Sequence, residues 1–352
     1  MVWDRRSIAL TAVGATAAVA LVVAGVVYVT RGSPAGQLAS APKPAPSPSP
    51  SPSHREPLRS PFTGELVHRL KRVLVVKIGN TFPERPATGL ARADIVYLIP
   101  VEGGLSRIMA VFSSHYPRAI GPVRSAREDD LDLLRQFGRP AFAWSGAQPR
   151  LQWVVQHARI VDLYAGTSGG YFRTVDRVEP YNLYANTRTL LKEAKHASVA
   201  RDIGFRFGPP PPGGRHLRSK SVSYPAASFR FTWSPGKGRW LVSMDGSPAI
   251  STGAGRMSAP TVVIQRVVVG LSRFLEQGPM MPPDAHSVGS GTALVLRNGE
   301  AYHARWSRPS ADGGTTFTTD SGKPMTFARG PVWIVLAYGP GSSPWRSGKP
   351  VP

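Results

Sequence analysis

The sequence predicts an α/β layer domain followed by a smaller, mostly β domain, with a single N-terminal transmembrane helix. Three observations lead to this prediction. Residues 7–30 form an uncharged apolar run, residues 61–207 alternate strand-like and helix-like segments, and residues 221–352 carry strand-like segments without a helical period. Strands that alternate with helices are typical of a layered α/β domain, whereas consecutive strands are typical of an all-β one.

The apolar run SIALTAVGATAAVALVVAGVVYVT, residues 7–30, is long enough to cross a bilayer, which takes about 20 apolar residues. Arg5 and Arg6 precede the run and only Arg31 follows it, so residues 1–6 are expected in the cytoplasm. The alternative is a cleaved signal peptide, whose apolar region spans about 7 to 15 residues. We therefore predict a single-pass cell-membrane protein with its bulk outside the cytoplasm.

The chain is strongly basic, with 43 Lys and Arg against 21 Asp and Glu and a formal net charge of +22. Such an excess attracts polyanions, and the predicted export favours anionic lipid or a cell-wall polymer over nucleic acid. A GC-rich coding bias, which the 36 Gly and 35 Pro also indicate, is the alternative origin of the arginines. The sequence has no Cys, which excludes disulfides, thiol catalysis and an acylated N-terminal Cys.

Residues 31–60 predict a disordered spacer, because this Pro/Ser/Ala tract has almost no apolar side chains to bury. Its alternating Pro and Ser favour an extended chain of about 3.1 Å per residue. The spacer would therefore hold the folded part away from the membrane.

Residues 61–207 contain short β-branched runs separated by segments with helical spacing. Ser125 and Glu128 form a capping-box pattern at the start of the first predicted helix. The predicted strands are 73–78, 94–99, 107–112, 140–146 and 160–164, and the predicted helices are 126–137, 150–158 and 187–203.

A linker is predicted over 208–220, because Gly208–Gly214 contains four consecutive Pro, which cannot donate backbone hydrogen bonds. The segment 221–352 that follows is predicted to be all β. Asn298-Gly299 predicts a tight hairpin turn, since both residue types tolerate positive φ. The strands expected here are 229–233, 239–244, 260–270, 291–299, 300–307 and 331–338.

The first candidate site is IGPVRSARED, residues 120–129, between a predicted strand and a predicted helix start. Arg124 and Arg127 flank a helix N-terminus, where free amides favour anions, and arginine binds oxyanions in a bidentate way. The alternative is that Arg127 only pairs with neighbouring acidic residues at the surface.

The second candidate cluster surrounds a predicted hairpin. Asp94 opens one strand, Glu102 precedes the Gly103-Gly104 turn, and Arg107 opens the return strand. These charges could meet at one edge of a sheet. The alternative is an ordinary hairpin whose charged residues are solvated or paired across the strands.

The third candidate cluster is the polar and aromatic segment 171–187. Asp176, Arg177, Asn182 and Tyr184 suit a sugar or another polar ligand, since rings stack and amides orient hydroxyls. The alternative is an ordered loop with buried tyrosines. The eight His are scattered without an HxH or HxxxH pair, so no metal site is predicted, and no motif indicates a cofactor.

Five segments taken together resemble the YerB-like putative lipoproteins, a bacterial family of unknown function. They are KIGNTFPERPATGLARADIVYLIPVEGGLSRIMAVF, IGPVRSAR, DRVEPYNLYANT, GSGTALVLRNGEAYHARWSR and TTDSGKPMTFARGPVWIVL. The resemblance covers about 61–340 and implies two domains divided where the Pro-rich linker lies. Unlike lipoprotein members, this chain has no Cys to acylate.

A second resemblance, in the order of features only, is to the LytR-CpsA-Psr phosphotransferases. It implies that Arg124 and Arg127 hold a pyrophosphate and that Asp94 helps to position a divalent cation. A glycan hydrolase would instead need two carboxylates about 5 to 9.5 Å apart. The carboxylates available for such a pair are Asp94, Glu102, Asp129 and Asp176.

The sequence therefore favours an envelope protein with an arginine-containing cleft that binds an anionic or glycan ligand of the cell wall. An enzyme acting on wall polymers, either a phosphotransferase or a glycan hydrolase, is the alternative. The ligand, any reaction and the oligomeric state are left open.

Overall fold

The structure is a computed structural model that describes residues 57–274 and 282–343. Within these ranges the chain is mostly β, and its three α-helices are only seven or eight residues long. The predicted N-terminal α/β layer architecture is therefore wrong. No helix in the described ranges is long and apolar enough to cross a membrane, and the predicted transmembrane segment 7–30 lies outside them. The predicted transmembrane helix thus has no support in the structure.

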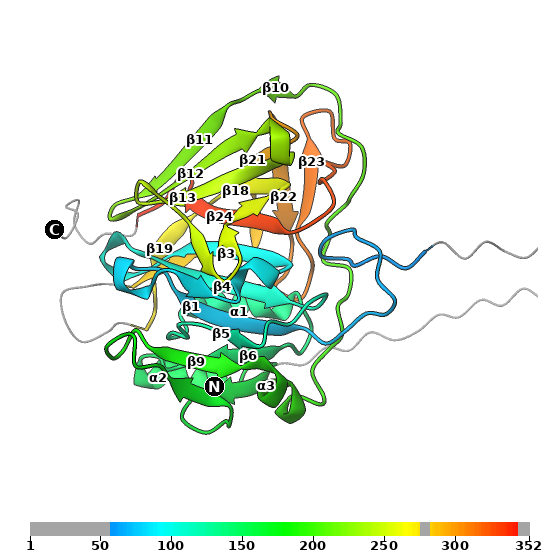
Figure 1. The fold of residues 1–352 in the computed structure, drawn as a ribbon. Helices are drawn as coiled ribbons and strands as arrows, with labels where there is room; N and C mark the ends of the chain where they lie inside the picture. The colour runs from blue at the N-terminus through cyan, green and yellow to red at the C-terminus, as the bar shows by residue number, and fades with distance from the viewer. Residues whose placement is uncertain (1–56, 275–281, 344–352) are drawn as a thin grey trace, which may run out of the picture. The chain divides into compact units, whose positions relative to one another are not determined.

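One large mixed sheet organises the fold (Figure 1). Its strand order is β10-β22-β21-β18-β24-β3-β4-β1-β6-β7, and β23 pairs with β22. β1, β3 and β4 form antiparallel pairs, whereas β24 joins β3 in parallel and so connects the C-terminal part of the sequence to the N-terminal part. The strands are β1 (Leu74–Gly79), β3 (Ile95–Pro100), β4 (Ser106–Phe112), β6 (Ala141–Trp144), β7 (Val161–Tyr164), β10 (Arg215–His216), β18 (Thr261–Val267), β21 (Gly289–Arg297), β22 (Glu300–Arg308), β23 (Thr316–Thr319) and β24 (Val332–Tyr338).

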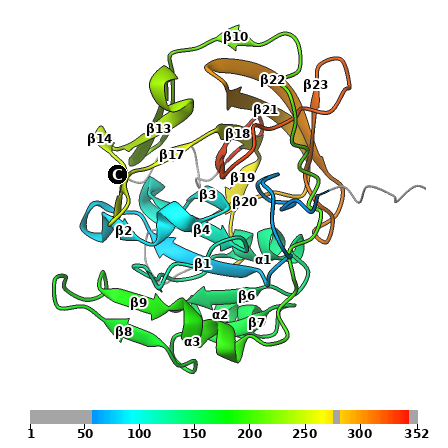
Figure 2. The same ribbon diagram turned by 45° about the vertical axis from the view of Figure 1, so that its right-hand side comes forward.

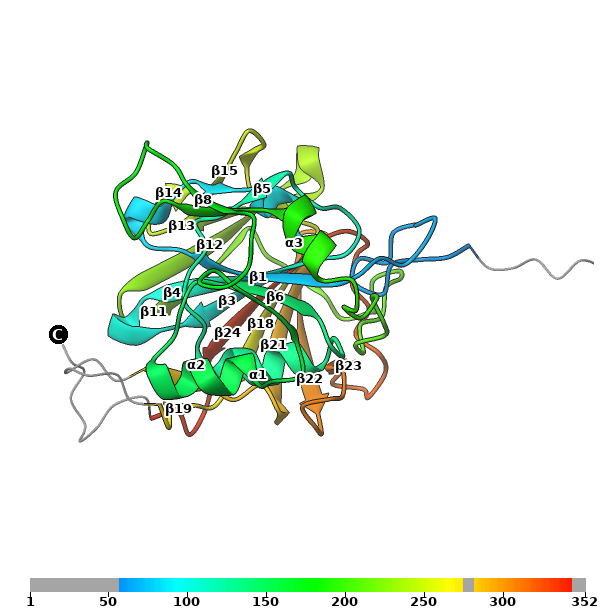
Figure 3. The same cartoon turned by 90° about the horizontal axis from the view of Figure 1, so that it is seen from below.

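Two apolar cores lie on opposite faces of this sheet. Helices α1 (Glu128–Arg135) and α2 (Pro149–Gln156) cover one face, and α3 (Thr187–Glu193) lies over the other (Figure 3). The alternating residues of each strand supply both cores, so the central strands are apolar on both faces and read as continuous hydrophobic runs.

Smaller sheets complete the layer that contains α3, where the β8–β9 hairpin leads into that helix (Figure 2). Their strands are β2 (Ala87–Thr88), β5 (Ala119–Ile120), β8 (Tyr171–Arg173), β9 (Leu183–Asn186), β11 (Ser219–Tyr224), β12 (Ala227–Ser234), β13 (Arg239–Met244), β14 (Ser247–Pro248), β15 (Ile250–Thr252), β16 (Gly255–Arg256) and β17 (Ser258–Ala259). A separate two-stranded sheet is formed by β19 (Val269–Leu271) and β20 (Pro283–Ala285).

Most predicted strands lie within one or two residues of an observed one, but the predicted helix 187–203 ends at Glu193. The reason is a tertiary contact. Residues 198–200 pair with the segment before β1, where the Val73 N–H donates to the Ser198 carbonyl at 2.8 Å and the Ala200 N–H to the Lys71 carbonyl at 2.9 Å. A helix over these residues would forgo those bonds.

The predicted α/β architecture failed for a similar reason. In the part of the chain that the structure describes, parallel crossovers through helices occur only where β1, β6 and β7 adjoin. The rest of the sheet is built from hairpins and from strands distant in sequence. The helical spacing of residues 126–137 was correct locally, yet it could not reveal which strands pair.

Candidate functional site

A pocket of about 420 Å³ lies beside the turn between β3 and β4, and we call it the arginine pocket. It gathers four of the residues selected from sequence, namely Glu102, Arg107, Arg124 and Arg127. It is lined by Thr81, Pro83, Glu84, Val101, Glu102, Leu105, Ser106, Arg107, Arg124, Arg127 and Tyr181.

The β3–β4 turn places Glu102 at the rim of the sheet. Glu102 begins a single 3₁₀ turn, Glu102–Gly104, and Arg107 follows as the second residue of β4. Gly104 has φ 71°, and a Cβ there would lie 2.6 Å from the Pro225 Cβ. The turn therefore needs glycine both for its backbone angle and for the space.

The loop before α1 carries the other two arginines. The Arg124 N–H donates to the Lys77 carbonyl at 2.9 Å, which ties the loop to β1. At the helix start the Arg127 N–H donates to Asp130 Oδ2 at 2.7 Å. Asp130 also pairs with Lys77 in a fully buried ion pair, so the loop is held from both sides.

Among the residues that the structure describes, three guanidinium groups in the pocket face two carboxylates. Arg124 Nε lies 2.5 Å from Glu84 Oε1, and Arg127 pairs with Glu102 through its Nε. Arg107 approaches the same Glu102 only to 4.0 Å and donates a long hydrogen bond of 3.4 Å to the Ser125 carbonyl. The pocket thus has an excess of one positive charge, and Arg107 is its most weakly bound cation.

The electrostatics follow from this crowding. Burial and then repulsion by Arg127 lower the pKa of Arg107 to about 10. Burial acts to raise the pKa of Glu102, but Arg127 and Arg107 outweigh it and leave that pKa below its ordinary value. Glu102 is therefore ionised at neutral pH, and a bound anion would relieve the repulsion among the arginines.

Glu84 completes the pocket, although the sequence analysis did not select it. Its Oε2 accepts hydrogen bonds from the Thr81 N–H and from Thr81 Oγ1, both at 2.7 Å. Gly79 leaves the space for this carboxylate, since a Cβ there would meet Glu84 Oε1 at 2.1 Å. The Thr-x-x-Glu pattern at 81–84 is a capping-box signal that could have identified Glu84.

The four residues selected in the third predicted cluster, Asp176, Arg177, Asn182 and Tyr184, are not among those that line the pocket. Arg177 donates to the carbonyls of Glu84 and Pro86, each at 2.8 Å, and so holds the Glu84 turn. Asn182 and Tyr184 are buried within the structure, and Asp176 is exposed. The residue of this segment that lines the pocket is Tyr181, whose ring lies 5.4 Å from the Arg124 guanidinium carbon.

Asp94 lies at the other end of β3, away from the arginine pocket. It is buried, and its Oδ2 accepts hydrogen bonds from the N–H groups of Ser113 at 2.5 Å and Ser114 at 2.8 Å. Burial raises the pKa of Asp94 to about 6, against the lowering effect of these bonds. The structure therefore separates Asp94 from Glu102 and Arg107, with which the sequence grouped it.

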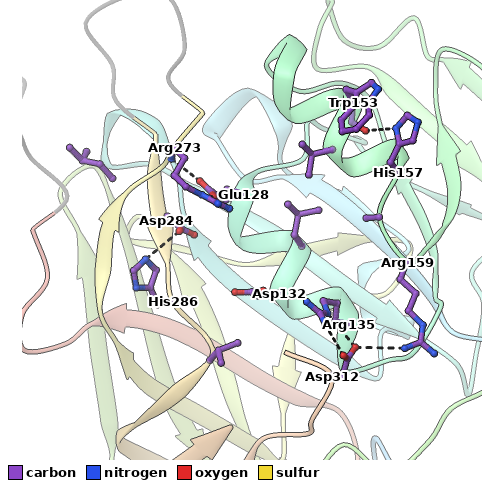
Figure 4. Close-up of a pocket in the computed structure, with 15 residues that line it drawn as sticks. Glu128, Asp132, Arg135, Trp153, His157, Arg159, Arg273, Asp284, His286 and Asp312 are labelled. Atoms are coloured by element: carbon purple, nitrogen blue, oxygen red, sulfur yellow. Dashed lines mark hydrogen bonds and ion pairs between the residues drawn. The ribbon is translucent and has the colours of Figure 1, made fainter. Parts of the chain in front are cut away.

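A larger pocket of about 1060 Å³ lies between α1, α2 and the β19–β20 sheet, and we call it the helical pocket (Figure 4). Asp284 lies 3.2 Å from His286 on one side, and the exposed Trp153 stacks on His157 on the other, with ring centroids 4.2 Å apart. Burial, followed by repulsion from Glu128, raises the pKa of Asp284 to about 6.

The helical pocket escaped the sequence analysis because its residues come from distant segments. Glu128 at the start of α1 pairs with Arg273 at 2.5 Å, and Asp312 pairs with Arg135 at 2.7 Å. No local spacing connects these residues. Among the residues that the structure describes, no group of three or more His, Asp or Glu side chains is arranged to hold a metal ion.

Comparisons with known proteins agree on one family. Residues 62–200 match the family described as "Protein of unknown function (DUF3048) N-terminal domain", and residues 220–334 match the corresponding C-terminal domain. The "Putative lipoprotein YerB" of Bacillus subtilis (strain 168) is 25% identical over 304 residues, which are 79% of this chain and 85% of that protein.

A solved structure shares the fold. The crystal structure of the YerB protein from Bacillus subtilis superposes with a TM-score of 0.69 at 21% identity and covers 80% of this chain and 96% of that one. The chain belongs to the YerB-like family, whose function is unknown.

Proposed function

We propose that the protein is an extracytoplasmic, envelope-associated binding protein whose arginine pocket holds an anionic group of a cell-wall ligand. The observation that carries this proposal is the convergence of Arg107, Arg124 and Arg127 on one pocket with only two carboxylates. A carboxylate or phosphate group would accept forked hydrogen bonds from Arg107 and would supply the missing negative charge.

The size of the arginine pocket favours binding of one small group of a ligand over binding of a long polymer segment. At about 420 Å³ it lies at the small end of the range for small-molecule sites. Tyr181 and Leu105 line it together with the charged groups, so an apolar sugar face has contacts beside the arginines. A single acidic sugar or a sugar phosphate matches these dimensions.

The state of the carboxylates favours binding over catalysis. Glu84 and Glu102 are both held by arginines, and the low pKa of Glu102 makes it a poor proton donor at neutral pH. The other carboxylates considered for a catalytic pair, Asp94, Asp129 and Asp176, are not among the residues that line the arginine pocket. Asp94 lies at the far end of β3, Asp129 is buried and Asp176 is exposed. The enzyme alternative therefore has weaker support.

The experiment is a calorimetric titration of the full chain with glucuronate and with inorganic phosphate. Arg107→Gln should weaken binding of the preferred anion about 10-fold or more, since a hydrogen bond to a charged group contributes about 1.5–3 kcal/mol. Arg206→Gln is the matched control, because Arg206 pairs with Asp202 at the exposed surface. Equal affinities in the two variants, or no binding by the unaltered chain, would refute the proposal.

The envelope assignment is supported by the relative named as a putative lipoprotein. None of the 352 residues here is Cys, so acylation of Cys is not available in this sequence. Fractionation of cells that express the full chain tests the assignment. We expect the protein in the envelope fraction and accessible to protease added outside the cytoplasmic membrane, and recovery in the cytosol would contradict it.

A second candidate function is glycan binding in the helical pocket, and one observation favours it. Trp153 is 63% exposed although it is a large aromatic residue, and it lines the helical pocket together with charged side chains. Flat exposed rings of this kind stack on sugars. Trp153→Ala should abolish retention of the protein on insoluble wall glycan without changing phosphate binding, and retention equal to that of the unaltered chain would exclude this candidate.

A further inference from the structure

We propose that a second site, at the opposite end of β1 and β4 from the arginine pocket, binds a linear polymer of phosphate diesters. Two adjoining cavities of about 640 and 500 Å³ share Tyr116, Pro117 and Arg118, and together we call them the basic groove. The groove is lined by Lys71, Arg72, Arg92, Ser114, His115, Tyr116, Pro117, Arg118, Thr187, Arg188, Leu191, Lys192 and Lys195.

Four chain segments of the described structure bring the cations together, and one of them is the 3₁₀ turn Leu90–Arg92, which carries Arg92. Lys71 and Arg72 come directly before β1, and Arg118 lies in the loop that leaves β4. Arg188 and Lys192 are four residues apart on α3, so they project from the same face of that helix.

The charge of the groove is one-sided. Of the described residues that line the groove, seven are Lys or Arg and none is Asp or Glu. Within the described ranges, none of these seven side chains forms an ion pair with a carboxylate, whereas the arginines of the arginine pocket are held by Glu84 and Glu102. Clustered cations repel one another, and a polyanion removes that repulsion.

Two of the cations hold the walls together and leave the others to a ligand. Arg72 donates to the carbonyls of Leu191 and Ala194, each at 2.8 Å, which ties the end of α3 to the segment before β1. Lys71 donates to the Ser114 carbonyl at 2.7 Å. The remaining five, Arg92, Arg118, Arg188, Lys192 and Lys195, are all exposed.

The floor of the groove is apolar and fixed in place. Tyr116 donates its hydroxyl to the Arg72 carbonyl at 2.5 Å, and Pro117 and Leu191 are buried beside it. Asp94 holds the same loop through the N–H groups of Ser113 and Ser114. An apolar strip between cations suits a polymer in which carbon units alternate with phosphates, and two cavities in a row suit a chain rather than a single anion.

The groove is separate from the arginine pocket. Gly79 of β1 pairs with Arg107 beside that pocket, and Leu74 pairs with Phe112 beside the groove. The five residue steps from Leu74 to Gly79, at about 3.3 Å each, separate these two ends of β1 by about 17 Å. The proposal therefore does not depend on the arginine pocket, and either site can fail alone.

The test measures binding of the full chain to purified poly(glycerol phosphate) by fluorescence anisotropy over a range of salt concentrations. The variant combines Arg188→Gln, Lys192→Gln and Lys195→Gln, which change exposed side chains. The control combines Arg218→Gln, Arg230→Gln and Lys237→Gln, which remove the same charge from exposed positions outside the groove.

We expect the groove variant to bind the polymer about 10-fold more weakly or worse. Its plot of log affinity against log salt concentration should also be less steep, with the magnitude of the negative slope smaller by about three, one for each lost contact. The control should stay within about twofold of the unaltered chain. Arg118→Gln, a single exposed change at the junction of the two cavities, should reproduce part of the loss and guards against misfolding of the triple variant.

Equal losses in the two triple variants would overturn the proposal, because they would show that net charge alone attracts the polymer. Binding to vesicles of anionic lipid without binding to the polymer would also overturn it and would identify a membrane surface as the partner. Arg107→Gln should leave polymer binding unchanged, which distinguishes failure here from failure of the arginine pocket.

Discussion

Lys77 and Asp130 form an ion pair with no exposed surface on either side chain, with Nζ 2.5 Å from Oδ1. The pair joins the centre of β1 to the first turn of α1. Because Asp130 also accepts a hydrogen bond from the Arg127 N–H, the pair fixes the position of the loop before α1 relative to the sheet. It is a structural support of the arginine pocket and does not line it.

Lys77→Met should destabilise the protein by about 3–5 kcal/mol, because it leaves the Asp130 carboxylate buried without its cation. Chemical denaturation measures the free energy of unfolding. Lys237→Met, at an exposed position, should change it by less than about 0.5 kcal/mol. A loss for Lys77→Met as small as that of the control would show that Asp130 is stabilised in some other way.

Asp94→Asn should remove a pH dependence of stability. Burial raises the pKa of Asp94 in the folded protein to about 6, above the ordinary value of 3.8. The contribution of this group to the free energy of unfolding is therefore fully present below pH 3.8 and is lost as the pH rises through 6. The difference between the ordinary pKa of 3.8 and the folded pKa of about 6 corresponds to about 3 kcal/mol. Asparagine keeps an oxygen that can accept the Ser113 and Ser114 N–H bonds.

Denaturation curves between pH 4 and 7 check this prediction. The unaltered chain should lose stability relative to Asp94→Asn across that interval, and Asp162→Asn is a suitable comparison because Asp162 is only half-buried. If the free energy of unfolding changed with pH in the same way for Asp94→Asn and for the unaltered chain, the raised pKa of Asp94 could not be the cause of the pH dependence.

Gly104→Ala should cost more stability than a glycine replacement in open space. Gly104 has φ 71° and its Cβ would meet the Pro225 side chain, whereas Gly238 has φ 58° with nothing within 4 Å. Backbone strain alone costs about 1 kcal/mol, so Gly238→Ala reports that part. We expect a clearly larger decrease in unfolding temperature for Gly104→Ala than for Gly238→Ala. Equal decreases would mean that the segment around Pro225 moves to make room for the added Cβ.

Glu84→Gln should change stability and anion affinity in opposite directions. Arg124 would lose its partner, which destabilises the fold, while the arginine pocket would gain a second uncompensated positive charge. Phosphate should therefore raise the unfolding temperature of Glu84→Gln more than that of the unaltered chain. The measurement is thermal unfolding with and without phosphate, and a smaller phosphate effect in the variant would contradict the prediction.

Several features followed from local sequence alone. The β-branched runs form β1, β3 and β4 close to their predicted bounds, and Asn298-Gly299 makes the turn between β21 and β22 with φ values of 53° and 78°. Glu102 and Arg107 lie together because a short turn joins their strands. Each of these depends on residues a few positions apart, where backbone preference and side-chain period act directly.

Tertiary structure decided what local preference could not. β24 pairs with β3 and makes one sheet of distant segments, which overturned the predicted α/β architecture, and the contact between Val199 and Arg72 ended α3 early. Glu84 met Arg124 only because separate loops converge on one end of the sheet. Strand pairing and burial act between residues far apart in the chain, so the composition of the arginine pocket and of the basic groove emerged only in the folded molecule.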